Sequence, residues 1–289
     1  MIKANKIIGI VLLSLFLLGC GSGGGTKQID YNFKQGTSGL QVSFMDNAPP
    51  KKIYENSNFN VILKMENKAA YDLVNGQITL SGINPQYFVF EKKTETFSIL
   101  EGRNLYLPDG GVSYIEFPAK SEKLFLNAES YQGKYFLNID FDSTMEFVDT
   151  ICINPNLYSV YDAGCQIEDR KSYSGQGAPL AVVEVEEIIH PETVGGQVEF
   201  RFLLRNRGQG EVEYIELTKA MLGSSEFDEC KFKEGYFDSK KVLLTKQNQE
   251  ALLVCKTHLK EQGSYTTTVL LDFNYHYEMQ EVHNLMLYE

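Results

Sequence analysis

The sequence predicts an all-β protein in which two antiparallel sandwiches follow one another along the chain. Three observations predict this fold class. Apolar residues recur at every second position in many short segments, and no convincing helical period extends over ten residues after residue 38. In addition, segments of the first half recur in the same order in the second half.

Period-two alternation is clearest in the segment 59–67, which reads FNVILKMEN. Its apolar residues from Phe59 to Met65 share one face of an extended chain while polar residues occupy the other face, as in a half-buried strand. Further strands are expected at 76–81, 87–91, 94–100, 113–117, 122–127, 134–142 and 145–153. Turn signals such as Asn84-Pro85 and the PDGG of residues 108–111 separate them.

Three segments of the first half recur in the second half with the same apolar face. The offsets between the copies are 140, 139 and 130 residues. The matching pairs are 40–45 with 180–185, 59–67 with 198–206, and 133–141 with 263–271. Such an order is hard to obtain by chance, so the sequence predicts two tandem copies of one fold.

The ends of the repeated strands carry a family resemblance. The strand that ends in Asn206–Gly210 and its counterpart that ends in Asn67–Ala70 resemble the apolar strand and N-x-G turn of immunoglobulin-like domains in prokaryotic surface proteins, among them the cell-adhesion-related domains of bacteria. The Gly-x-Tyr segments at 133–135 and 263–265 resemble a tyrosine corner that leads into a late strand. The resemblance therefore implies two tandem immunoglobulin-like β-sandwiches.

The resemblance is limited to architecture. The chain contains no Trp, and Leu137 and Thr267 stand where an antibody domain has its second cysteine. Because one fold supports many functions, the resemblance implies no catalytic or binding residue.

The first twenty residues have the pattern of an export signal. Lys3 and Lys6 precede an uncharged apolar run, Ile7–Leu18, which ends in Gly19 and Cys20. This ending resembles the lipobox of prokaryotic lipoproteins. The resemblance implies cleavage before Cys20, a lipid on its thiol, and a membrane-anchored protein on the extracytoplasmic side, at the cell surface or in the periplasm.

A short buried helix or an uncleaved membrane span is the competing interpretation of this segment. The apolar run is shorter than the roughly 20 residues that span a bilayer, and the glycine-rich stretch Gly21–Gly25 follows it at once. We therefore favour a signal peptide. The expected organisation is 1–19 signal peptide, 20–38 lipidated Cys and flexible tether, 39–153 first sandwich, 154–178 connector and 179–289 second sandwich.

The charge of the chain excludes one class of partner. The formal net charge is 27 − 38 = −11, and loss of the two signal-peptide lysines makes it 25 − 38 = −13. Such an acidic protein is not expected to bind nucleic acid, because the phosphate backbone repels it.

Four cysteines remain once Cys20 is assigned to the lipid. An even set in an exported protein predicts disulfides, and four cysteines allow three pairings. We favour Cys152 with Cys165 and Cys230 with Cys255, because these are nearest in sequence and fall one in each half. Buried free thiols are the competing interpretation, and a zinc site is disfavoured because no Cys-x2-Cys spacing occurs.

The sequence offers no established catalytic motif. It has no Gly-x-Ser-x-Gly, no His-Glu-x-x-His and no phosphate-binding glycine loop. Acidic and histidine residues that could bind a metal or act as acid and base are more simply solvated surface groups, so we expect no metal and no cofactor. These residues are His276, Glu278 and His283, the pair Asp140 and Asp142, and the group Glu184, Glu186 and Glu187.

The sequence therefore favours a non-enzymatic surface lipoprotein that acts as a binding, adhesion or structural module. Its expected partners are the lipid bilayer through Cys20 and another envelope or extracellular protein or glycan. The alternatives are a hydrolase or carbohydrate-active enzyme on a β-sandwich, whose site would be assembled from distant strands, and a docking subunit of an envelope assembly. We further expect the first sandwich to act as a spacer and the second to meet the partner.

Replacement of Cys20 with Ser should abolish lipid attachment, because serine lacks the thiol that carries the lipid. The variant should accumulate as an uncleaved precursor or be secreted. Mass spectrometry of the membrane fraction measures this. A wild-type chain without a lipid adduct on Cys20 would contradict the assignment.

Overall fold

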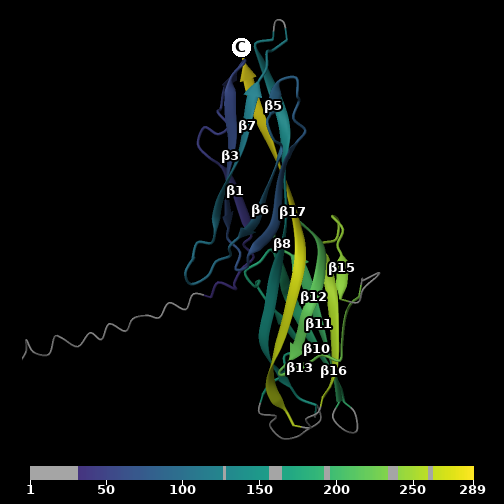
Figure 1. Ribbon diagram of the computed structural model, residues 1–289. Helices are drawn as coiled ribbons and strands as arrows, with labels where there is room; N and C mark the ends of the chain where they lie inside the picture. Colours follow the sequence, from purple (N-terminus) through teal and green to yellow (C-terminus); the bar gives the residue numbers. More distant parts are fainter. Residues whose placement is uncertain (1–31, 126–127, 156–164, 192–195, 234–239, 260–262) are drawn as a thin grey trace, which may run out of the picture. The chain divides into compact units, whose positions relative to one another are not determined.

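The computed structural model describes residues 32–125, 128–155, 165–191, 196–233, 240–259 and 263–289 (Figure 1). The predicted signal peptide, Cys20 and most of the predicted tether lie outside this range. The described chain from Phe33 to Glu289 belongs to one compact unit. Every regular element in it is a strand, and nearly all pairings are antiparallel, which confirms the predicted fold class. Within the described residues, no helix is long and apolar enough to cross a membrane.

A four-stranded sheet forms one layer of the first half, in the order β1-β3-β7-β5. Its strands are β1 (Leu40–Phe44), β3 (Asn58–Asn67), β7 (Val112–Ser121) and β5 (Phe88–Phe90). The alternation predicted at 59–67 is observed on β3, where Val61, Leu63 and Met65 are fully buried. Burial of these side chains is the main reason that this segment is a strand.

A five-stranded sheet forms the corresponding layer of the second half, in the order β14-β16-β11-β10-β9. Its strands are β14 (Glu229–Phe232), β16 (Glu250–Leu259), β11 (Gly196–Asn206), β10 (Leu180–Pro191) and β9 (Arg170–Ser172). The order β10-β11-β16-β14 repeats β1-β3-β7-β5, as expected for two copies of one fold.

An eight-stranded sheet serves both halves as the opposite layer. Its main path is β13-β12-β17-β8-β4-β6, with β15 paired to β12 and β2 paired to β17. The strands are β13 (Ser225–Glu226), β12 (Glu211–Leu222), β17 (Tyr265–Tyr288), β8 (Ser130–Ile153), β4 (Leu73–Ser81), β6 (Thr94–Leu100), β15 (Lys241–Leu243) and β2 (Ile53–Tyr54).

The two central strands, β8 and β17, are each 24 residues long and pair antiparallel along their whole length. At about 3.3 Å per residue, such a ladder extends over roughly 75 Å. The expectation of separate strands at 134–142 and 145–153 is wrong, because polar Ser143 does not interrupt the strand. Ser143 is buried and its hydroxyl donates to the carbonyl of Asp72 at 2.9 Å.

The internal repeat extends to the pairing register. Leu40 pairs with Asn67, and Leu180 pairs with Asn206, so the offsets of 140 and 139 are reproduced. The two long strands β8 and β17 were expected to be copies of one another at an offset of 130 residues, but their pairing with β4 and β12 gives a different offset. Leu73 of β4 pairs with Ser143, and its counterpart Val212 of β12 pairs with Tyr277, which gives 277 − 143 = 134 rather than 130.

The two repeated asparagines, Asn67 and Asn206, perform the same task. Each side-chain oxygen accepts from the backbone N–H two residues later at 2.9 Å. Each side-chain nitrogen donates to the carbonyl four residues later, at 2.9 and 2.7 Å respectively. The predicted N-x-G-like turns are therefore held by buried or half-buried amides. Tyr135, in contrast, forms no tyrosine corner, since its buried hydroxyl has no partner among the described residues.

The core lies between the eight-stranded sheet and the two smaller sheets. Phe88 of β5 lies 6.2 Å from the ring of Tyr131 near the start of β8, so the four-stranded sheet covers this end. Phe147, near the other end of β8, lies 6.0 Å from the ring of Phe202 on β11, so the five-stranded sheet covers that end. Each half is thus a β-sandwich that shares its second layer with the other half (Figure 1).

The chain enters the body at the junction of the two halves. Lys34 pairs with Glu146 at 2.5 Å, and Gly36 forms a parallel bridge with Gln176. Part of the predicted tether thus packs on the body, and β9 lies within the predicted connector. The expectation that the first half is a spacer and that the second half meets the partner stays a prediction. The division into two domains stays a prediction.

Fragments 33–155 and 165–289 should associate one to one when mixed, because each contains one strand of the central ladder and a strand without its partner exposes a row of backbone groups. Analytical ultracentrifugation measures this. Two fragments that each fold cooperatively and remain monomeric together would contradict it.

Candidate functional site

The four cysteines form two disulfides. Cys152 on β8 is joined to Cys165 with an S–S distance of 2.05 Å, and Cys230 is joined to Cys255 at 2.03 Å. The second pair lies directly opposite in the register of β14 and β16. This is the pairing favoured by the sequence, and it leaves none of these thiols for a metal. Stable disulfides are typical of exported proteins.

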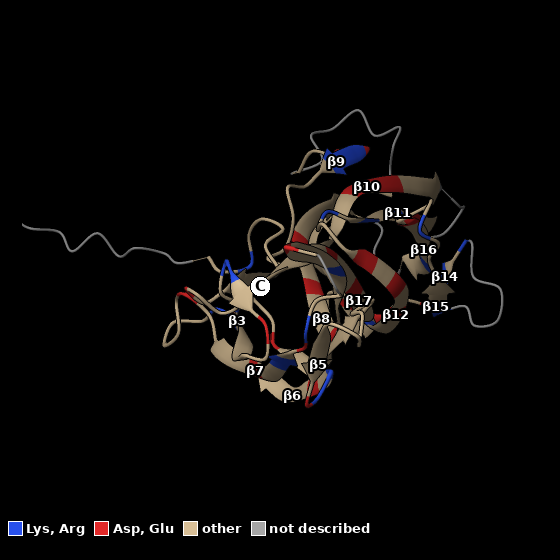
Figure 2. Cartoon of the chain, turned by 90° about the horizontal axis from the view of Figure 1, so that it is seen from above, with Lys and Arg blue, Asp and Glu red and all other residues tan. Residues whose placement is uncertain are grey.

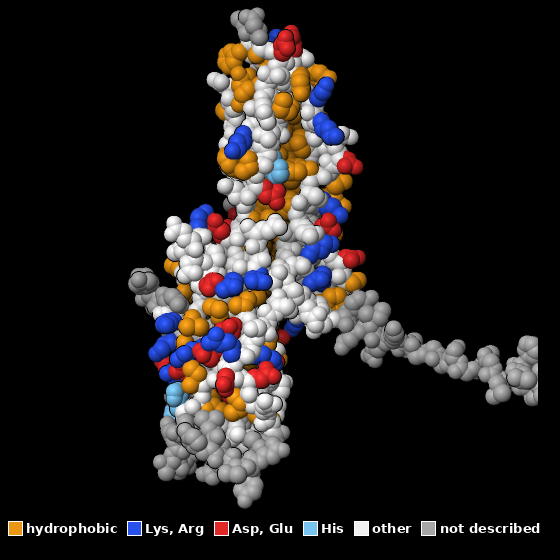
Figure 3. All heavy atoms as spheres, turned by 180° about the vertical axis from the view of Figure 1, so that it is seen from behind, with side chains coloured by type: hydrophobic (Ala, Val, Ile, Leu, Met, Phe, Trp, Pro, Cys, Tyr) orange, Lys and Arg blue, Asp and Glu red, His pale blue; other side chains and the backbone are white. Residues whose placement is uncertain are grey.

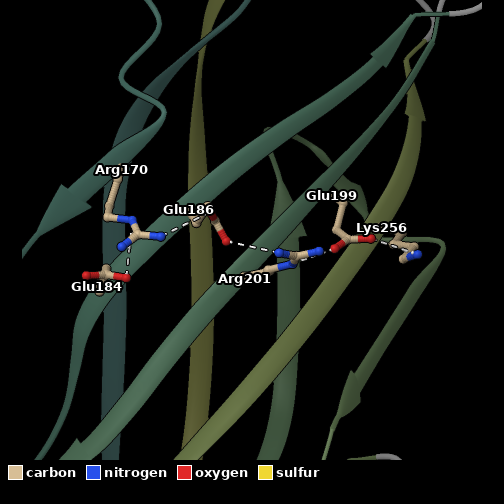
Figure 4. A network of polar contacts seen from close by, with 6 residues as sticks. All are labelled: Arg170, Glu184, Glu186, Glu199, Arg201 and Lys256. Atoms are coloured by element: carbon tan, nitrogen blue, oxygen red, sulfur yellow. Dashed lines mark hydrogen bonds and ion pairs between the residues drawn. The ribbon is translucent and has the colours of Figure 1, made fainter.

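The exposed face of the five-stranded sheet carries a chain of alternating charges (Figure 4). Each acidic group in it contacts at least one basic group, at distances from 2.7 to 3.5 Å; the residues are Arg170, Glu184, Glu186, Arg201, Glu199 and Lys256. Figure 2 shows the basic side of this pattern on β9 beside acidic positions on β10. Hydrogen bonds from Lys256 and Arg201 hold the pKa of Glu199 below its usual value. Both Glu184 and Glu186 therefore have basic partners in the structure.

Glu187, which the sequence grouped with Glu184 and Glu186, lies on the buried face of β10 rather than on the charged face. Its side chain is 8% exposed, and one carboxylate oxygen has no partner among the described residues. Burial, assisted by the nearby charge of Asp169, raises the pKa of Glu187 to about 7. Sequence reasoning grouped Glu187 with its exposed neighbours and did not predict its burial, because a bulge between Val182 and Glu184 shifts the register of β10.

A polar groove of about 530 Å³ lies at the junction of the halves. It is lined mainly by Thr37–Ser43 with β1, by the turn Arg207–Gly210, and by Tyr277. The backbone N–H of Gly210 donates to the hydroxyl of Tyr277 at 2.6 Å, which fixes the turn. Among its described lining residues, the carboxylates of Glu66 and Glu281 contact Lys68 and His283 rather than a serine or threonine hydroxyl of the groove.

A cluster of acidic residues surrounds His276 on the outer face of the eight-stranded sheet. His276 pairs across the ladder with Asp142, and its Nδ1 lies 2.8 Å from the carboxylate of Asp142. Its Nε2 lies 4.0 Å from a carboxylate oxygen of Glu213. Glu278 is two residues along the same strand and pairs with Asp140. We call Asp140, Asp142, Glu213, His276 and Glu278 the central cluster.

The sequence grouped His276 and Glu278 with His283, and this grouping is wrong. His283 contacts Glu281 at 3.0 Å and packs edge-on against Phe44, away from His276. The structure instead brings in the β8 carboxylates, which lie 134 or more positions away in the sequence. Predicting that Asp140 and Asp142 lie beside His276 would have required knowledge of the pairing between β8 and β17. The described side-chain hydrogen bonds of His258, His276 and His283 are with carboxylates, not with serine or cysteine nucleophiles.

Exposed apolar residues are most prominent at one loop tip between β6 and β7. Leu105 is 74% exposed and Tyr106 is 97% exposed. Figure 3 shows hydrophobic side chains along the upper lobe of the molecule, with charged side chains interspersed both there and on the lower lobe. Large apolar side chains that are mostly exposed at a single tip are candidates for contact with a partner.

No protein-family model matches the chain, and no curated protein matches it. Among solved structures it is similar to the secreted serine protease VesC from Vibrio cholerae, with 17% identity and a TM-score of 0.21 over 81% of this chain and 49% of that chain. The E. coli chaperone DraB matches with 10% identity and a TM-score of 0.20 over 80% of this chain and 95% of its own. The CsuC-CsuE chaperone-tip adhesion subunit complex of Acinetobacter baumannii matches with 12% identity and a TM-score of 0.20, over 79% and 97%.

The chain thus spans about half of the length of the protease that it matches. Structural similarity at these TM-scores does not indicate the activity or the partners of this chain. Any function must therefore be argued from the residues of this chain.

Glu187→Gln should stabilise the protein at high pH and leave it unchanged near pH 4. A carboxyl group whose folded pKa is raised from 4.5 to about 7 makes the folded state progressively less stable as the pH rises through this interval. The loss is complete above the folded pKa and has an upper limit of about 3 kcal/mol.

Urea unfolding of wild type and variant at pH 4 and pH 8 measures the difference. Glu184→Gln, at a partly exposed position paired with Arg170, is the matched control and should show little change at either pH. An equal effect of Glu187→Gln at both pH values would contradict the assignment.

Proposed function

We propose that this chain is a non-enzymatic binding module, anchored to a membrane by a lipid on Cys20 and located on the extracytoplasmic side. The export signal, the Gly-Cys boundary and the two disulfides support the location. The proposed partner is another envelope or extracellular protein, or a glycan.

The observation that carries the binding proposal is the apolar tip formed by Leu105 and Tyr106. These are the two central residues of a tight turn in which Asn104 and Leu107 exchange backbone hydrogen bonds of 3.1 and 3.2 Å. The side-chain oxygen of Asn104 also accepts from the backbone N–H groups of Tyr106 and Leu107, both at 2.9 Å. Two large apolar side chains are thus held out in water on a turn that is already ordered.

The base of this loop is tied to the body as well. The backbone N–H of Arg103 donates to Ala69 at 2.8 Å, and that of Gly102 donates to the carboxylate of Asp72 at 2.8 Å. A preordered loop loses little conformational entropy when it binds, so the apolar area of Tyr106 contributes directly to affinity. Tyrosine is also among the residue types that dominate binding energy at interfaces.

The continuous ladder of β8 and β17 makes the body suited to present such a tip. The loop that carries the tip also contacts the last part of the predicted tether, because the Arg103 side chain donates to the carbonyl of Phe33 at 3.4 Å.

A photo-crosslinking amino acid at position 106 of the anchored, full-length chain should trap one dominant partner in the native envelope. The partner is identified by mass spectrometry. An unlabelled competitor chain that carries Tyr106→Ser should be needed at a concentration at least tenfold higher than the wild-type competitor to reduce the crosslinking by half. Leu243→Ser, at a leucine that is 65% exposed on β15, is the matched control and should compete fully. Equal competition by the Tyr106 variant and the control would contradict the proposal.

A further inference from the structure

Three side chains of the central cluster are arranged as metal ligands. Glu213 comes from β12, and His276 and Glu278 come from one face of β17. One ligand atom from each lies within 4.8 Å of the others. The His276 side chain is 19% exposed, whereas both glutamates reach the surface. Small rotations of the two glutamate side chains would let all three ligand atoms lie 2.0–2.2 Å from one zinc ion, which is the usual distance for such ligands.

The histidine is already oriented for this role. Asp142 accepts from its Nδ1 at 2.8 Å, which places the proton on Nδ1 and leaves the lone pair of Nε2 directed to the side of Glu213. Asp142 is itself held by the side-chain amide of Asn75 at 3.1 Å. A carboxylate that fixes the far nitrogen of a ligand histidine is a regular feature of metal sites in proteins.

The backbone places Glu213 beside the histidine through a register shift. Val212 pairs with Tyr277 and Tyr214 pairs with His276, so Glu213 is the extra residue of a bulge in β12. A bulge re-aims the inserted side chain, and here it brings a carboxylate of β12 to a histidine of β17. Tyr214 stacks on the His276 ring with centroids 6.1 Å apart and restricts its rotation.

The local charge favours a cation. Lys246, on a neighbouring loop, pairs with Glu211 at 3.1 Å, and the described contacts give Glu278 no basic partner. The ion-pair chain of the five-stranded sheet, by contrast, already contains its own cations.

We propose that Glu213, His276 and Glu278 bind one divalent transition-metal ion, with zinc as the best match. A histidine nitrogen with two carboxylates is a zinc-type donor set, whereas calcium and magnesium prefer oxygen ligands alone. Three protein ligands leave a fourth position open to water or to a side chain of a binding partner. The ion would link β12 to β17 at the bulge, where the ladder of hydrogen bonds is interrupted.

The test is a titration of the full chain with Zn²⁺ against a chromophoric chelator, in a Cys20→Ser background so that no free thiol competes. Wild type should bind one ion per chain and should not bind Ca²⁺ at the same site. His276→Gln and Glu213→Gln should each weaken binding at least tenfold. Glu213 is exposed, so its variant retains the fold even if His276→Gln does not, and circular dichroism checks both.

His258→Gln is the matched control, because His258 also lies 2.9 Å from a carboxylate, that of Asp228, but belongs to no described three-ligand group. It should bind Zn²⁺ as wild type does. Absence of one-to-one binding, preference for Ca²⁺, or equal binding by wild type and both cluster variants would each overturn the proposal. The last result would identify an adventitious ion only.

Discussion

The antiparallel ladder between β8 and β17 is the interaction on which the rest of the structure depends. Each strand begins in one half and ends in the other, so the same 24 residue pairs complete the second layer of both sandwiches. Neither half contains all of the strands of its own core. The last residues of β17 also pair with β2 in the first half, at Leu287 with Ile53, which shows how far the second copy reaches into the first.

The ladder also assembles the chemistry of the surface. Asp142 and His276 meet only because β8 and β17 pair at their middle, and Glu213 joins them only because β12 is bulged at that level. The backbone pairing of β8 with β17 holds Asp142 directly opposite His276. The apolar tip at Tyr106 depends less on the ladder, because its turn is held by local bonds from Asn104.

The sequence predicted the strands well, since alternation at positions such as Val61, Leu63 and Met65 directly reports which face is buried. It also indicated the repeat, because Asn67 and Asn206 carry the same turn. It did not predict that the strand continues through Ser143. The alternation of polar and apolar residues does not reveal that a serine hydroxyl can be buried when it donates to a backbone carbonyl. The central cluster was missed because its members are brought together by register, and one shift in β12 decides which glutamate lies beside His276.

The central claim is that one ladder joins both halves into a single cooperative unit. Native-state hydrogen exchange along β8 and β17 tests this claim most directly, because amide protection reports the free energy of opening at each residue. We predict the same opening free energy for amides near Leu137 and near Phe147, equal to that of global unfolding. Two distinct values, one for each half, would contradict the account.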